Sequence, residues 1–250
     1  MRNSIYISEV IQYGPNLKED EILGICENIS HYYNLKSFKK TDSIKKIAYE
    51  NEFENLNKGN ERIIKMSKSK YIDDFFKNGS LQLGTFKYYQ QFDNPEIGDK
   101  TEGSFVVVGQ NSKSTTFAVV GGGFNNYMFC AYNGAPNPEV INKFGYDDYF
   151  EITNIQGFRD AIARKLEATN ILSSNCLYRQ FKVLVGQTDE NFNLQELSNA
   201  YNLVNNSKYF IKTTDFDHQN EYRILWNLPT DLEDKLIIKC PEAIQYCKRK

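Results

Sequence analysis

The chain has 250 residues, a mass of 29.0 kDa and a net charge of -2, from 30 Lys and Arg against 32 Asp and Glu. This length allows a substantial core in one large domain or two small ones, and the nearly balanced charge excludes a general electrostatic attraction to nucleic acid or anionic lipid. Five scattered cysteines, two histidines and the lack of a run of roughly 20 apolar residues argue against disulfides, structural zinc and a membrane span, so we expect a cytoplasmic protein with no metal and no membrane partner.

The first 60 residues are expected to form a helical extension, followed by a main domain over residues 61–250. The clearest helix is predicted over residues 16–29, where an acidic first turn suits the helix dipole. Its apolar residues recur at helical spacing, at Ile22, Leu23, Cys26 and Ile29. A second helix is predicted over residues 41–55.

The main domain begins with a predicted strand over residues 62–66. Ser69 favours the start of a helix through Lys77, and Asn78-Gly79 ends that helix. Alternating residues then predict a strand over 80–89. This strand leads into an acidic loop over residues 94–103.

Short strands follow the loop, separated by polar turns, at residues 104–109, 115–120 and 126–132. Asn154 is a predicted N-cap for a helix that runs to about residue 168. Four further strands are predicted at residues 177–185, 209–212, 221–226 and 236–239. Short connections favour antiparallel pairing, so the pattern predicts an α+β fold, mostly antiparallel sheet with a few helices.

The late strand places Glu221 and Arg223 two residues apart, so both side chains leave the same face of the sheet. An ion pair on the solvated face of a half-covered sheet is one interpretation. The acidic loop offers another, because Asp99 and Glu102 stand between two glycines that let the backbone turn tightly and approach a ligand. We expect the loop and the late strand to converge into one polar cleft.

The order of the motifs resembles a broad bacterial and phage family of unknown function, over roughly residues 62–226. The matching segments are Ser69-Lys-Tyr71, Asn78-Gly79, Leu81-x-Leu-Gly-Thr85, Asp99-x-x-Glu102, Met128-Phe-Cys130, Phe210-Ile-Lys212 and Gln219-x-Glu-Tyr-Arg223. The acidic positions of the family's early loop match here, whereas its Asn and Pro positions do not. The late Glu-Tyr-Arg strand matches better.

The layout is also similar, more distantly, to ADP-ribosyltransferases that modify nucleic acids, in which a first strand carries His or Arg, a helix ends in Gly, and a late strand supplies a glutamate. The resemblance implies NAD as co-substrate and Glu221 as the catalytic glutamate. Lys65 stands nearest to the place of the family's His or Arg, and a lysine lacks the planar fork of arginine. The remaining substrate-binding residues that we expect are Ser67, Tyr71, Asp99, Glu102, Gln219 and Arg223.

The expected function is therefore an NAD-consuming, ADP-ribosyltransferase-like effector or toxin in conflict between bacteria and phage. Its acceptor would be a nucleic acid or a protein, and a partner protein would restrain it. Three alternatives stay open. The same cleft would serve a non-catalytic module that binds a nucleotide or a phage component. Asp99, Glu102 and Glu221 would serve a nuclease as metal ligands. The Glu221–Arg223 pair would otherwise only stabilise the fold.

Overall fold

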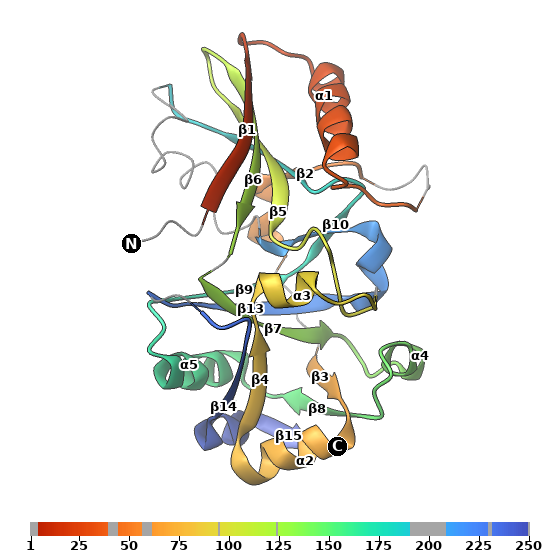
Figure 1. Cartoon of the computed structure of the whole chain (residues 1–250), viewed down its shortest axis with the longest axis vertical. Coiled ribbons are helices and arrows are strands. Elements are labelled where there is room, and N and C mark those ends of the chain that lie inside the picture. The colour runs from red at the N-terminus through yellow and green to blue at the C-terminus, as the bar shows by residue number, and fades with distance from the viewer. Residues whose placement is uncertain are drawn as a thin grey trace.

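The computed structural model describes residues 5–39, 45–56, 62–94, 96–123, 125–190, 209–229 and 232–249. The predicted α+β class is confirmed, because mostly antiparallel strands form the sheets and a few helices cover them. Figure 1 shows a five-stranded sheet at one end of the long axis and an eight-stranded sheet at the other. No helix within the described ranges is long and apolar enough to cross a membrane.

The five-stranded sheet has the order β1-β6-β5-β11-β2. The bounds are β1 Ile5–Tyr13, β6 Thr115–Gly122, β5 Ser104–Gln110, β11 Val183–Gln187 and β2 Ala48–Tyr49. β6 pairs antiparallel with β1 and β5, whereas β11 runs parallel to β5 and β2. Helix α1 (Glu19–Tyr32) buries Ile22, Cys26 and Ile29 against one face of this sheet.

The expectation of a helical N-terminal extension needs correction. β1 is an edge strand of the five-stranded sheet, and β2 lies at its other edge, so both are part of a sheet built from distant segments. The helix predicted over residues 41–55 is a 3-10 helix, η1 (Glu50–Asn55), preceded by β2; residues 40–44 lie outside the described part. β1 depends on long-range pairing with β6, which a local sequence pattern does not reveal.

The eight-stranded sheet contains the order β14-β4-β7-β3-β8-β15, with β13 on the other edge of β7 and β9 beyond it. The bounds are β14 Lys235–Lys239, β4 Ser80–Gly84, β7 Asn126–Asn133, β3 Ile63–Ser67, β8 Asp148–Ile152, β15 Cys247–Arg249, β13 Glu221–Asn227 and β9 Asn170–Asn175. All its pairs are antiparallel. β10 (Leu177–Arg179) and β12 (Ile211–Thr213) form a separate parallel pair.

Helices cover both faces of the eight-stranded sheet. One face packs against α2 (Ser69–Asn78), α5 (Ile155–Leu166) and the 3-10 helix η4 (Pro241–Tyr246), through a large apolar cluster. The opposite face meets α3 (Phe86–Gln90) and α4 (Pro138–Lys143), and the 3-10 helix η3 (Thr214–Gln219) leads directly towards β13. This second face carries the polar residues of the late strand.

One edge of β7 is shared by two diverging strands. β3 pairs with β7 at Tyr132 and Asn133, whereas β4 pairs with it at Met128. β13 pairs with the other edge over the whole length of β7. The sheet is therefore split around Cys130, between β3 and β4.

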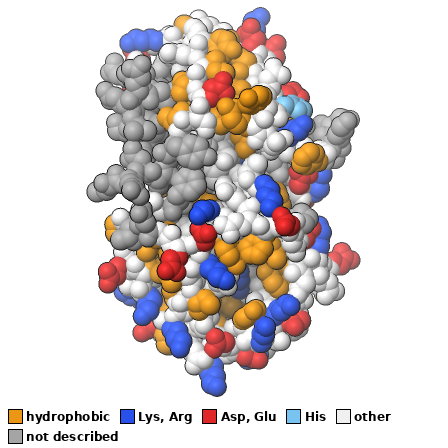
Figure 2. All heavy atoms as spheres, in the orientation of Figure 1, with side chains coloured by type: hydrophobic (Ala, Val, Ile, Leu, Met, Phe, Trp, Pro, Cys, Tyr) orange, Lys and Arg blue, Asp and Glu red, His pale blue; other side chains and the backbone are white. Residues whose placement is uncertain are grey.

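Figure 2 shows acidic and basic side chains interspersed over the half that carries the eight-stranded sheet, and hydrophobic side chains both there and at the end that carries β1 and α1. The exposed large apolar residues within the described ranges are Val10, Tyr13, Tyr32, Phe38, Tyr71 and Ile237. The presence of charges of both signs is in keeping with the net charge of -2.

Candidate functional site

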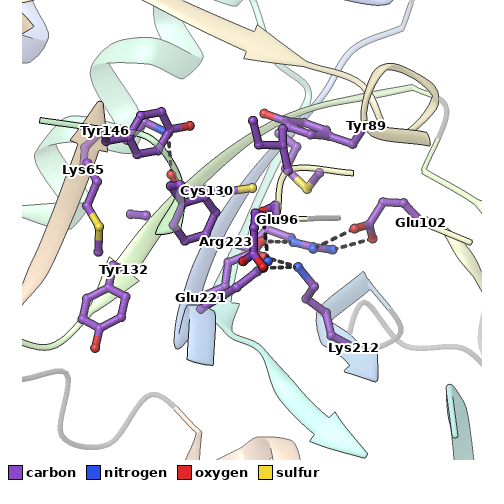
Figure 3. A pocket seen from close by; sticks show the side chains of 16 residues that line it. Lys65, Tyr89, Glu96, Glu102, Cys130, Tyr132, Tyr146, Lys212, Glu221 and Arg223 are labelled. Carbon is purple, nitrogen blue, oxygen red and sulfur yellow. Dashed lines mark hydrogen bonds and ion pairs between the residues drawn. The ribbon is translucent and has the colours of Figure 1, made fainter. Parts of the chain in front are cut away.

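A cavity of about 110 Å³ opens at the split between β3 and β4. Its charged lining residues are Lys65, Glu96, Glu102, Lys212, Glu221 and Arg223. Its aromatic lining residues are Tyr89, Tyr132, Phe144 and Tyr146, and Figure 3 shows Tyr89 and Tyr146 above the group formed by Arg223, Glu221 and Lys212. The cavity therefore combines a charged wall with aromatic surfaces, as small-molecule sites commonly do.

Glu221 and Arg223 share one face of β13, as the alternation of the strand predicts. They do not meet solvent, because only 5% of Glu221 and 1% of Arg223 is exposed. Arg223 Nε donates to Glu221 Oε1 at 2.7 Å, and Lys212 Nζ donates to Oε2 at 2.7 Å. Both oxygens of the Glu221 carboxylate are thus held by cations of the protein itself.

Arg223 also joins β13 to the acidic loop. Its Nη1 and Nη2 donate to the two oxygens of Glu102 at 3.0 and 3.1 Å (Figure 3). Nη1 also donates to the Tyr209 carbonyl at 2.6 Å. This two-pronged geometry matches the planar fork of a guanidinium. The structure therefore brings together the two polar clusters that the sequence shows far apart.

The buried cluster fixes its own protonation state. Burial alone would raise the pKa of Glu221, but Arg223 and Lys212 outweigh it and hold the pKa well below its usual range. Burial would lower the pKa of Lys212, but Glu221 and Glu102 raise it above its usual range. Glu221 is therefore ionised near neutral pH and is a weak proton acceptor, so it can act through its charge.

Asp99 lies beside this cluster and outside the cavity lining. Lys182, which immediately precedes β11, donates from Nζ to Asp99 Oδ2 at 2.5 Å and to the hydroxyl of Thr101 at 3.0 Å. Burial would raise the pKa of Asp99, but the Lys182 ammonium lowers it to about 2. Asp99 thus anchors the acidic loop to the five-stranded sheet through Lys182. We had expected Asp99 to contact a ribose or the acceptor instead.

Lys65 reaches into the gap in the split sheet. Its Nζ donates to the carbonyl of Cys130 at 2.7 Å and lies 4.6 Å from the centre of the Phe129 ring. Burial lowers the pKa of Lys65, and no carboxylate of the described residues lies within ion-pair distance of its ammonium. Lys65 therefore offers the cavity a cation that the described part of the protein does not neutralise by direct contact.

Two expected site residues lie elsewhere. Ser67 pairs with Asp148 on β8, and Tyr71 is 58% exposed on α2 with the Lys70 ammonium 4.8 Å from its ring. Neither lines the cavity, and α2, which carries Tyr71, packs on the opposite face of the sheet. The expectation that Ser67 and Tyr71 contact the same ligand as Glu221 is therefore corrected.

Gln219 does line the cavity and connects its wall to its mouth. Its Oε1 accepts from Lys212 Nζ at 2.6 Å, and its Nε2 donates to the carbonyl of Glu96 at 3.1 Å. The Glu96 carboxylate in turn lies 2.7 Å from His218 Nε2 and 3.1 Å from Lys143 Nζ, and these two nitrogens lie 3.1 Å from each other. Hydrogen bonds therefore run from the buried Glu221 cluster to a partly exposed cluster at the cavity mouth.

Sequence reasoning missed several of these residues. Lys212 stands in the Phe-Ile-Lys motif, so its presence there was a usable signal. No sequence signal indicated the aromatic side of the cavity, where Phe144 and Tyr146 come from the segment after α4. The centroids of these two stacked rings lie 5.6 Å apart, with an angle of 2° between the ring planes. Such a pair offers flat apolar surface to a planar ring.

Among the residues that the structure describes, no group of three or more His, Cys, Asp and Glu side chains is placed to hold a metal ion. The carboxylates that a nuclease would use as metal ligands are instead bonded to Lys or Arg. These pairs are Asp99 with Lys182, Glu102 with Arg223, and Glu221 with both Arg223 and Lys212.

Comparison of the chain with protein-family models, with curated proteins and with solved structures found no match. The functional argument therefore starts from the geometry of the cavity.

Proposed function

We propose that the cavity binds the nicotinamide end of NAD and that the protein is an ADP-ribosyltransferase-like effector or toxin. One observation carries the proposal: Lys65 on the strand before α2 and Glu221 on the late strand line the same cavity, although they are far apart in sequence. Between them stand α2 and its C-cap Gly79, in the order that the distant resemblance implies.

The chemistry requires a negative charge near the ribose. When the bond between ribose C1 and the nicotinamide nitrogen breaks, nicotinamide leaves with the electron pair and C1 becomes oxocarbenium-like. The acceptor then attacks C1 and loses its proton. Glu221 remains ionised, so its carboxylate would stabilise the developing positive charge, while Gln219 and Arg223 keep it in place. The aromatic residues of the cavity would pack against the nicotinamide ring.

A second candidate is a non-catalytic module that binds a nucleotide. The observation that favours it is the engagement of both Glu221 oxygens by Arg223 and Lys212, which leaves the local cluster with balanced charge. A binding module needs only the shape and hydrogen bonds of the cavity. In that case Glu221→Gln would leave ligand affinity largely intact.

The test is NAD consumption by purified wild-type protein and Glu221→Gln, with cell lysate as the source of acceptors and with EDTA present in parallel. Circular dichroism first establishes that both proteins are folded. We expect the wild type to consume NAD in EDTA and Glu221→Gln to lose at least about a hundredfold in rate. Consumption that is equal in both proteins would contradict a catalytic Glu221, and NAD binding without consumption would favour the binding module.

A second substitution guards against misfolding of Glu221→Gln. Lys65→Met leaves the Glu221–Arg223–Lys212 cluster intact, so we expect it to fold and still lose NAD consumption. A wild-type rate in Lys65→Met would remove Lys65 from the proposed site.

The proposal places the protein in the cytoplasm, where NAD is available, and its five free thiols are compatible with a reducing compartment. The acceptor would be a nucleic acid or a protein. A toxin that consumes NAD would also need a restraining partner, and a role in conflict between bacteria and phage would account for such a pair. Co-purification of a partner during expression, together with loss of NAD consumption when it is bound, is the test of that part.

A further inference from the structure

We propose that Lys143 and His218 form a phosphate subsite at the mouth of the cavity, and that the carboxylate of Glu96 occupies this subsite when no ligand is bound. The inference rests on the proposed function for the identity of the whole ligand. The inference identifies the part of the ligand that is bound outside the cavity, namely the pyrophosphate of a dinucleotide.

The first argument is size. A cavity of about 110 Å³ is well below the roughly 300–1,000 Å³ of sites that enclose a drug-sized ligand. It has room for one planar ring and too little room for a dinucleotide. The phosphates of such a ligand must therefore lie at or beyond the mouth, where Glu96 lines the cavity.

The second argument is the arrangement of a lysine ammonium and a histidine imidazole at that mouth. Lys143 Nζ lies 3.1 Å from Glu96 Oε1, and His218 Nε2 lies 2.7 Å from Glu96 Oε2. Lys143 ends α4 and His218 belongs to η3, so two separate elements converge on one carboxylate. A phosphate group offers two oxygens to such donors much as a carboxylate does.

The third argument is that the Glu96 contacts are more exposed than the other contacts of the acidic loop. Glu102 and Asp99 are held in pairs whose side chains are at most 8% exposed. The Glu96 contact is partly open, with side-chain exposures of 18% for Glu96, 49% for Lys143 and 23% for His218. Exposed ion pairs contribute little net stability, so Glu96 can be replaced by a ligand anion while Asp99 and Glu102 keep the loop anchored.

The experiment measures binding of inorganic pyrophosphate, ADP-ribose and nicotinamide riboside by calorimetry, at two salt concentrations. The proteins are the wild type, Lys143→Met, Glu96→Gln and the control Lys100→Met. Lys100 belongs to the same loop and pairs with the exposed Asp93 at 2.9 Å, and neither residue lines the cavity. The control therefore removes the same charge without touching the subsite.

We expect Lys143→Met to lower the affinity for pyrophosphate and ADP-ribose about tenfold. Glu96→Gln should raise these affinities about threefold, because the competing carboxylate of Glu96 is gone. Lys100→Met should match the wild type, and nicotinamide riboside, which has no phosphate, should bind all four proteins alike. Equal affinities of pyrophosphate for Lys143→Met and Lys100→Met would overturn the subsite, as would a lack of pyrophosphate binding in every protein.

The outcome separates the subsite from the proposed function. Pyrophosphate binding that responds as expected, in a protein that does not consume NAD, would support the subsite and contradict the transferase. NAD consumption with identical pyrophosphate affinities in all variants would support the transferase and overturn the subsite.

Discussion

The Arg223 guanidinium donates two hydrogen bonds, of 3.0 and 3.1 Å, to the carboxylate of Glu102, a residue 121 positions earlier in the chain. The same guanidinium holds Glu221 from β13 itself. One side chain therefore fixes the acidic loop against the late strand and sets the position of the candidate catalytic carboxylate. Taking these charges out of water is costly, and their mutual pairing offsets that cost.

Removing the guanidinium should destabilise the fold strongly. Arg223→Met leaves Glu102 without its cation and Glu221 with only Lys212, and a buried pair broken on one side costs about 3–5 kcal/mol. Urea unfolding followed by circular dichroism measures the change. Arg62→Met is the matched control, because its pair with Glu151 is 42% and 29% exposed, and should cost less than about 1 kcal/mol. Similar losses in the two variants would contradict the role given to Arg223.

The ion pair between Asp99 and Lys182 should make the free energy of unfolding depend on pH. The folded pKa of about 2 lies below the ordinary value of 3.8, so the fold favours the ionised carboxylate. This contribution is fully present well above pH 3.8 and is lost as pH falls towards about 2. By linkage it amounts to about 2 kcal/mol near neutral pH.

We therefore expect Asp99→Asn to be less stable than the wild type at pH 7, with the gap narrowing between about pH 4 and pH 2. Urea midpoints across that range measure the gap. Asp93→Asn serves as control, since the Asp93 carboxylate, just before the acidic loop, is 99% exposed. A gap that stays constant with pH would show that Lys182 does not stabilise the ionised form of Asp99.

Much of the main domain could be predicted from local patterns. The predicted strand at residues 62–66 and helix at residues 69–77 correspond to β3 and α2, because alternation, a capping region and Asn78-Gly79 act within a few residues. β1 was not predicted, because an edge strand exposes side chains such as Val10 and depends on pairing with a distant strand.

The site divides in the same way. The shared face of Glu221 and Arg223 follows from the two-residue period of a strand. The burial of that face could not be predicted, because it depends on Lys212 and on the acidic loop, which reach β13 through tertiary packing. Tyr71 illustrates the opposite error: its sequence position beside the first strand suggested a ligand contact, but the helical turn directs it to solvent.

Gly79 should tolerate no side chain. It caps α2 with a φ of 69°, and a Cβ there would lie 2.4 Å from the backbone of Cys240. Gly145 is the matched control, because its φ is also 69° and nothing lies within 4 Å of the position that a Cβ would take. We expect Gly145→Ala to cost about 1 kcal/mol for the left-handed backbone alone, and Gly79→Ala to cost clearly more.

Thermal unfolding of both alanine variants measures this difference. Equal losses would mean that the Cys240 backbone moves aside without cost. A larger loss at Gly79 would show that the turn between α2 and β4 is fixed by its contact with the start of η4. That contact is relevant to the site, since β4 forms one side of the split in the sheet.

Lys65 should separate function from stability. Burial lowers the pKa of Lys65 and so disfavours its protonated form, and its Nζ donates to the Cys130 carbonyl at 2.7 Å. Lys65→Met removes the buried charge and keeps most of the volume, so the free energy of unfolding should change by no more than about 1 kcal/mol. NAD consumption, in contrast, should fall by at least about a hundredfold, because the cavity loses a cation that no carboxylate of the described residues contacts.

Parallel measurement of urea unfolding and NAD consumption compares the two effects. A variant that loses several kcal/mol of stability while the folded fraction retains full activity would mean that Lys65 closes the split in the sheet and takes no part in binding.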